Sequence, residues 1–161
     1  MRHAKHEMHS ERAGRAGSHH YGRLLAMVGL SFVAMYVLMY AMVDTFGNVF
    51  NNVNQFYMAG LMAAPMLLLE LWMMGTMYPN KGLNAGLAVA GLVVLMVFWF
   101  GIRHQVLVSD QQFVRSMIPH HASAILMCKQ NRLQDPDLQQ LCRDIIRSQQ
   151  AEIDLMKAKL R

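Results

Sequence analysis

Three long apolar runs with almost no charge between them constrain this chain more than any other feature. Residues 24–102 contain three charged side chains, which are Asp44, Glu70 and Lys81. The apolar runs cover residues 24–43, 56–77 and 83–102. About 20 helical residues rise about 30 Å, which is the thickness of the hydrocarbon layer of a bilayer. We therefore expect three transmembrane helices, joined by a polar loop at 44–55 and a tight turn at 78–82.

Basic residues predict how these helices are oriented. The first loop has no Lys or Arg, whereas basic residues flank the first run and occupy the second connection, at Arg12, Arg15, Arg23 and Lys81. The positive-inside rule then places the N-terminus in the cytoplasm and the C-terminal segment outside. We expect a protein of the bacterial inner membrane whose C-terminal domain is periplasmic or extracellular. The net charge of +5 fits such a topology and anionic lipid, not nucleic acid.

The chain divides into three regions by composition. Residues 1–23 are a His-rich cytoplasmic tail for which we expect little fixed structure, residues 24–108 are the transmembrane anchor, and residues 109–161 are a helical domain. In the tail, histidines recur every three residues, at His3, His6 and His9. Such tracts bind metal loosely. A solvated tail without a specific role explains the same pattern equally well.

Two start signals predict two helices after residue 108. Ser109 is followed three residues later by Gln112, which is the pattern of a capping box. Asp135 before Pro136 combines an N-cap with a proline at the first helical position. The linker between these helices is short, so they must be antiparallel neighbours. Pro119 lies inside the first helix and predicts a kink there.

Antiparallel pairing also predicts which side chains meet. Positions whose numbers sum to about 270 face each other, which brings Cys128 near Cys142 and His121 near Gln149. The two cysteines can then form a disulfide, which is plausible outside the cytoplasm, or serve as soft ligands.

The first of these helices concentrates side chains that bind soft metal ions. Thioether, imidazole and thiolate groups select Cu(I). Five such groups fall within three helical turns, at Met117, His120, His121, Met127 and Cys128. Adjacent histidines point about 100° apart on a helix, so each side would carry a half-site that another hairpin completes. An apolar core helix with two exposed or satisfied histidines is the alternative. Catalysis by Cys128 is not expected, because nothing places a base or an oxyanion site beside it.

The membrane helices carry a second candidate site. Glu70 lies in the second run on the same face as a row of methionines that includes Met66 and Met73. Intramembrane carboxylates are rare and face a bundle interior or a wet cavity. A methionine-lined path with one carboxylate would suit Cu(I), although three helices alone make a poor conduit. The alternatives are a neutral, hydrogen-bonded Glu70 and methionines that simply fill apolar helices.

The C-terminal segment carries an extended pattern. F-x-x-x-M-I-P-H-H-x-x-A-I-x-M runs from Phe113 to Met127, an Asp-Pro pair follows, and L-x-x-L-x-x-x-I-I-x-x-Q-x-x-E-I-x-x-M runs from Leu138 to Met156. This pattern, over roughly residues 109–160, resembles the domain of unknown function 305 family. Three spans before a single hairpin resemble a membrane-anchored branch of it. The resemblance implies a ferritin-like bundle and extracytoplasmic binding of copper or silver. The ligands that it implies are Met117, His120, His121, Met127 and Met156.

The sequence thus predicts an all-α protein with three transmembrane helices followed by an extracytoplasmic antiparallel two-helix hairpin, half of a ferritin-like bundle. We expect it to bind copper, as Cu(I), for sequestration, tolerance or hand-off, and not to be an enzyme. Its expected partners are the lipid bilayer and further copies of itself through the hairpin. A non-metal module that docks on an unidentified membrane complex is one alternative function. An oligomeric metal permease that uses the row around Glu70 is another.

Overall fold

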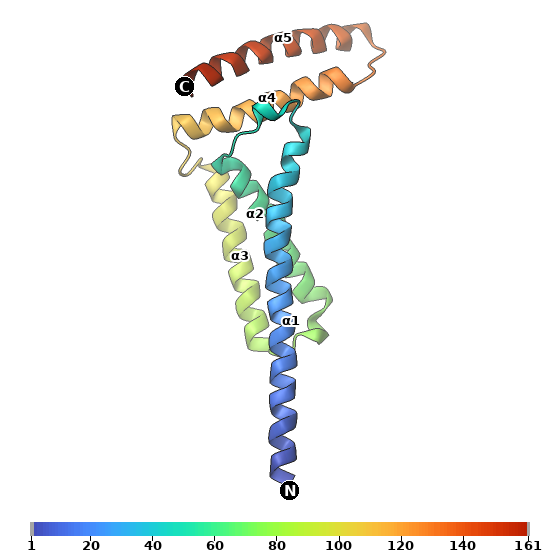
Figure 1. Ribbon diagram of the computed structural model, residues 1–161, viewed down its shortest axis with the longest axis vertical. Coiled ribbons are helices and arrows are strands. Elements are labelled where there is room, and N and C mark those ends of the chain that lie inside the picture. The colour runs from blue at the N-terminus through green and yellow to red at the C-terminus, as the bar shows by residue number, and fades with distance from the viewer. Residues whose placement is uncertain (1, 161) are drawn as a thin grey trace. The chain divides into compact units, whose positions relative to one another are not determined.

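The computed structural model describes residues 2–160, with side chains from residue 19 onward, and these residues form helices and connections without a strand. The α-helices are α1 (Arg2–Leu38), α2 (Val53–Met73), α3 (Lys81–Arg103), α4 (Asp110–Gln130) and α5 (Pro136–Lys159) (Figure 1). The connections contain the 3-10 turns η1 (Met39–Met42), η2 (Phe46–Asn48) and η3 (Gly75–Met77). The predicted all-α class is confirmed.

Three of the helical segments are long and apolar enough to cross a membrane. They are His19–Met42, Val53–Met73 and Lys81–Arg103, with mean hydropathies of 2.1, 1.5 and 2.4. This agrees with the three apolar runs of the sequence. The second run was expected to stay helical to Met77, but α2 ends at Met73 and a 3-10 turn begins at Gly75. Glycine weakens an α-helix because its backbone loses the most freedom on ordering.

The N-terminal tail continues into the first of the helices that are long enough to cross a membrane. Contrary to the expectation of little fixed structure, the backbone of α1 is helical from Arg2 onward. Alanine, arginine, lysine, glutamate and methionine supply much of this segment, and all are strong helix formers. The histidines that were predicted to bind metal loosely, at positions 3, 6 and 9, lie outside the residues whose side chains are described.

The chain forms two compact units, and the first contains the residues up to Met35 together with Met58–Phe100. Its core joins α1, α2 and the connection after α2 through the buried residues Tyr21, Leu24, Leu67, Leu71 and Tyr78, and Leu87 and Ala88 of α3 pack against it. The Tyr21 hydroxyl donates to Oδ1 of Asn84 at 2.5 Å, which links α1 to the start of α3. The ring of Phe98 on α3 lies so close to Gly60 of α2 that an added Cβ would overlap it. Close packing of this kind needs a residue without a side chain.

The second unit contains Tyr36–Tyr57 together with Gly101 and the residues after it. Here α4 and α5 lie side by side and run in opposite directions (Figure 1). Their shared core consists of four side chains that are 0% exposed, which are Ile118, Ala122, Ile125 and Ile153. Burial of large aliphatic side chains is the main force that holds two such helices together.

Both predicted helix starts are confirmed. The Ser109 hydroxyl accepts a hydrogen bond from the backbone N–H of Gln112. The Asp135 carboxylate accepts from two backbone N–H groups, and Pro136 occupies the first helical position. Pro119 lies inside α4, as predicted.

The connection between α1 and α2 packs against α4. Asp44 lies 3.8 Å from Nζ of Lys129 and accepts a hydrogen bond of 2.6 Å from Nδ2 of Asn48. The backbone N–H of Val53 donates to Oε1 of Gln112 at 3.1 Å. Buried polar groups of a loop need such partners, because each unpaired group keeps its full desolvation cost. Polar contacts from this connection therefore help to hold α4 in place.

Candidate metal centre

Three of the predicted ligands fall on one face of α4. Met117, His120 and Met127 are spaced by three and seven residues, and Phe113 and Ala124 continue the same row. Positions with this spacing lie within an arc of roughly 80° on a helix. Phe113 is 51% exposed, Met127 is 53% exposed, and His120 is exposed. We call these five residues the α4 row.

The imidazole of His120 is exposed, next to the buried ring of His121. Among residues 19–160, no hydrogen bond or ion pair engages its ring nitrogens. The ring is edge-on to that of His121, with 6.0 Å between the centroids. A neutral imidazole offers one lone pair for a metal ion. Met117 lies one helical turn before His120, so its thioether can reach the same space.

The neighbouring His121 has a different environment. It is 8% exposed, and its Nδ1 lies 2.9 Å from the carbonyl oxygen of Met117. A carbonyl oxygen only accepts, so Nδ1 must carry a proton and donate. Nε2 lies 2.6 Å from Oε2 of Glu152, with one proton between the two atoms. Neither nitrogen of His121 therefore has a lone pair for a metal in this structure.

The contact of His121 with Glu152 is one that the sequence reasoning missed. The pairing rule placed Gln149 opposite His121, whereas the contact is made one turn later, from α5. The position was visible as the glutamate of the second-helix pattern, on the apolar face of that helix. Gln149 instead has a buried Oε1 atom without a hydrogen-bond partner among the described residues.

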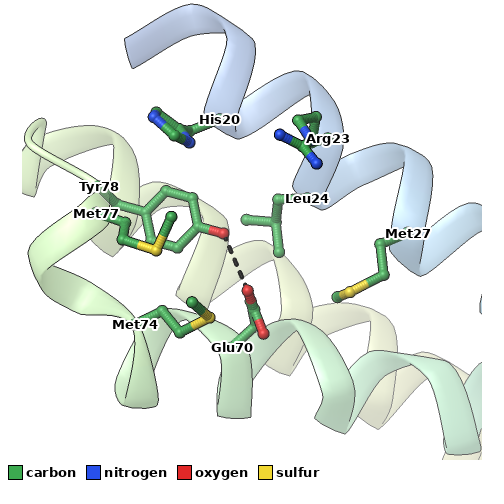
Figure 2. Close-up of a pocket in the computed structure, with 8 residues that line it drawn as sticks. All are labelled: His20, Arg23, Leu24, Met27, Glu70, Met74, Met77 and Tyr78. Atoms are coloured by element: carbon green, nitrogen blue, oxygen red, sulfur yellow. Dashed lines mark hydrogen bonds between the residues drawn. The ribbon is translucent and has the colours of Figure 1, made fainter. Parts of the chain in front are cut away.

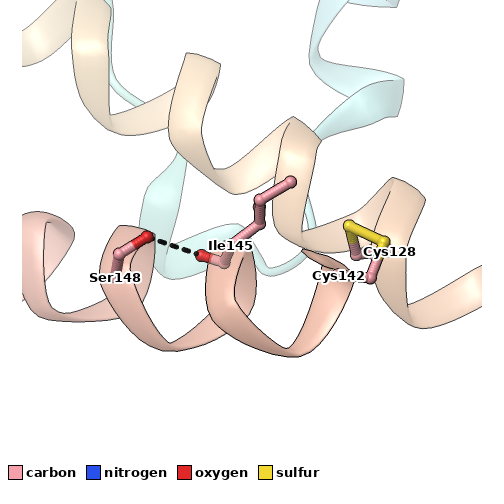
Figure 3. Close-up of a disulfide and its surroundings, with 4 residues drawn as sticks. All are labelled: Cys128, Cys142, Ile145 and Ser148. Atoms are coloured by element: carbon pink, nitrogen blue, oxygen red, sulfur yellow. Dashed lines mark hydrogen bonds between the residues drawn. A yellow bond between two sulfur atoms is a disulfide. The ribbon is translucent and has the colours of Figure 1, made fainter. Parts of the chain in front are cut away.

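The two cysteines are joined by a disulfide between α4 and α5 (Figure 3). The predicted proximity of Cys128 and Cys142 is thus correct, with 5.2 Å between their Cα atoms. A metal ligand must be a thiolate, and a disulfide sulfur is not one. Cys128 therefore leaves the predicted ligand set for as long as this bond is intact.

Met156, the last predicted ligand of this domain, belongs to the apolar core. It is partly buried and packs against the cluster formed by Ile118, Ile125 and Ile153. Within the part of the chain that has described side chains, no group of three or more His, Cys, Asp or Glu residues is arranged to hold a metal ion. A metal centre here would depend on thioethers, which favour soft ions.

Of the three predicted intramembrane residues, only Glu70 lines a cavity. Glu70 accepts a hydrogen bond of 3.3 Å from the hydroxyl of Tyr78 and lines a cavity in the first unit (Figure 2). Met73 is 75% exposed, and neither it nor Met66 lines that cavity. Burial raises the pKa of the Tyr78 phenol, and the nearby charge of Glu70 adds to the effect. The phenol therefore stays protonated at neutral pH and remains the donor.

The chain resembles known sequences, over its C-terminal part and over most of its length. A family described as Domain of unknown function (DUF305) matches residues 103–160, which include α4 and α5. The chain is 35% identical over 140 residues to "Uncharacterized protein L153" of Acanthamoeba polyphaga mimivirus. That similarity covers 85% of this chain and 90% of the viral protein. No solved structure matches this chain.

Proposed function

The chain belongs to the DUF305 family, and on that premise we propose that it is a membrane-anchored protein that binds a soft metal ion, Cu(I) above all. The α4 row holds the ion. The role is sequestration or hand-off of the metal, which is carried as cargo.

One observation carries the proposal. His120 is exposed, its ring nitrogens have no hydrogen-bond or ion-pair partner among the described residues, and it lies one turn from the thioether of Met117 on the same face of α4. Neutral sulfur and imidazole nitrogen are the donors that Cu(I) prefers. The α4 row contains no carboxylate, so it lacks the oxygen ligands that Ca²⁺ and Mg²⁺ need.

A second copy of the chain would complete this site. One α4 row offers a histidine and a nearby thioether, which is a half-site. Phe113 and Met127 of the row are exposed, and α5 adds exposed leucines, which are Leu138 (46%), Leu141 (53%) and Leu155 (61%). Two helices cannot bury both of their apolar faces, whereas two such pairs can form a four-helix bundle. We infer that two α4–α5 pairs join along these faces and bring two half-sites together.

The apolar helices support a location in a membrane. Three helices of membrane length precede α4. The basic residues before the first span and Lys81 in the second connection favour a cytoplasmic N-terminus and an extracytoplasmic α4–α5 pair. Metal bound outside the cytoplasm is kept away from the cell interior.

Titration of the purified protein in mild detergent tests the proposal. Cu(I) affinity is measured by competition with a chromophoric chelator. His120→Ala should lower the affinity of this site at least about tenfold, the loss expected when a ligand of a small site is removed. His104→Ala removes another exposed histidine of the same unit and serves as the control. An unchanged affinity in His120→Ala would contradict the site assignment.

A non-metal assembly module is the second candidate. It is favoured by the His121–Glu152 contact and the disulfide, which make the α4–α5 pair a preformed docking element. This function predicts that the chain associates equally well in the presence of a strong Cu(I) chelator and after His120→Ala. Light scattering of the detergent-solubilised protein, with and without Cu(I), separates the two functions.

A further inference from the structure

A cavity of about 380 Å³ lies in the first unit, at the end of α2. Its walls come from α1, from Glu70 of α2 and from the turn that follows α2. The residues with polar or sulfur-bearing side chains are His20, Arg23, Met27, Glu70, Met74 and Met77, with Tyr78 beside them. These groups belong to two stretches of the sequence, residues 20–27 and 70–78, so only the fold brings them together.

Glu70 occupies the middle of this arrangement. In Figure 2 the side chain of Met27 extends toward it from α1, and those of Met74 and Met77 extend from the turn after α2. One carboxylate oxygen accepts the hydrogen bond from Tyr78, and the other has no hydrogen-bond partner among residues 19–160. A carboxylate with one unengaged oxygen attracts a cation strongly where water is scarce.

We propose that this cavity is a second soft-metal site, which takes one Cu(I) or Ag(I) ion between the thioethers of Met27, Met74 and Met77 and the carboxylate of Glu70. Thioethers are neutral, soft donors that select Cu(I). One carboxylate neutralises the single positive charge of the ion. His20 lines the same cavity and offers an imidazole. This site goes beyond the α4 row, because it lies in the other unit and uses none of its residues.

Other occupants fit the cavity less well. A hard divalent cation needs about six oxygen ligands, and Glu70 is the one carboxylate among the lining residues. A phosphate group would find Arg23 and His20, but the charge of Glu70 opposes an anion in the same space. Arg23 is not within 4.0 Å of a Glu70 oxygen in the described residues, so it does not already neutralise the carboxylate. The balance of groups favours a soft monovalent cation.

Paired substitutions in the full-length protein test this site. Met74→Leu with Met77→Leu removes two cavity thioethers and roughly keeps the side-chain volume. Met66→Leu with Met73→Leu is the matched control, because both residues lie on α2 and neither lines the cavity. Ag(I) titration in detergent should show one weakened site in the first variant, by at least about tenfold, and none in the control. Equal binding by both variants and the original protein would overturn the proposal, and so would a loss confined to the control.

Substitution of the two charged residues of the cavity should change its Ag(I) affinity in opposite directions. Glu70→Gln should weaken Ag(I) binding, whereas Arg23→Gln should strengthen it, because a neighbouring positive charge is removed. If the cavity instead binds phosphate groups, Arg23→Gln abolishes binding of inorganic phosphate or of vesicles with anionic phospholipid and leaves Ag(I) binding unchanged. That result would also overturn the proposal.

The two proposed metal sites can be tested separately. His120→Ala should leave the Ag(I) site of the cavity intact, and Met74→Leu with Met77→Leu should leave the α4 site intact. Loss of only the cavity site in the second variant supports the inference even if the α4 row binds nothing.

Discussion

Nε2 of His121 lies 2.6 Å from Oε2 of Glu152, so this histidine joins α4 to α5. Its other ring nitrogen donates to the carbonyl oxygen of Met117. His120, the next residue in the chain, is exposed and makes neither kind of contact among the described residues. The two adjacent histidines therefore have different roles, one in stability and one as a candidate ligand.

His121→Ala should separate these roles. It removes both hydrogen bonds of a buried ring, which we expect to lower the free energy of unfolding by about 1–3 kcal/mol. Glu152 contributes little to this loss, because its side chain is 56% exposed and water can replace the histidine. The Cu(I) affinity should stay unchanged. Denaturant unfolding followed by circular dichroism, beside chelator competition, measures both quantities. Asp154→Asn, an exposed carboxylate of α5, is the control, and a variant of normal stability with lost Cu(I) binding would return His121 to the ligand set.

Replacing both Cys128 and Cys142 by serine should destabilise the α4–α5 pair. The disulfide closes a loop with a sequence separation of 14, and in the chain-entropy description such a loop contributes about 3 kcal/mol. The serine variant should bind as many Cu(I) ions as the original protein in its oxidised form, because disulfide sulfurs are not ligands. Unfolding curves of the oxidised, reduced and doubly substituted proteins test the first point. A lost Cu(I) equivalent in the serine variant would contradict the second.

The loop before α2 should loosen when its buried carboxylate is removed. The Asp44 side chain is 6% exposed, lies 3.8 Å from Lys129 and accepts from Asn48. Asp44→Ala leaves the Asn48 amide without this acceptor, so we expect a loss of about 1–3 kcal/mol. Hydrogen exchange of residues 44–50 should rise, and Asp154→Ala should leave it unchanged. Normal protection in Asp44→Ala would show that the apolar contacts of Val43 and Phe50 hold the loop alone.

Local chemistry explains what the sequence could predict. Ser109 and Asp135 cap their helices through contacts to backbone atoms two or three residues away, so a short stretch of sequence contains the whole interaction. The apolar runs likewise specify membrane-length helices without knowledge of their neighbours. The pairing of Cys128 with Cys142 followed from a short linker, which leaves antiparallel helices one way to align.

Contacts between distant segments could not be predicted in the same way. Gln112 was expected to complete a capping box, yet its side chain accepts from Val53, 59 positions away. Around Glu70, helical periodicity selected Met66 and Met73, which do lie with it on α2. Neither of them lines the cavity, which receives Met74 and Met77 from the connection after α2 and Met27 from α1.

The contact between α2 and α3 at Gly60 gives the last prediction. An added Cβ would overlap the ring of Phe98, so Gly60→Ala should force the helices apart or turn the ring and cost about 1–3 kcal/mol. Phe98→Leu in the same chain should recover part of that loss, because the smaller side chain leaves room for the methyl group. Gly86→Ala is the matched control: nothing lies within 4 Å of its added Cβ, and alanine favours a helix over glycine. Thermal unfolding in detergent measures all of these variants. If Gly60→Ala proves as stable as Gly86→Ala, α2 and α3 do not pack through this glycine.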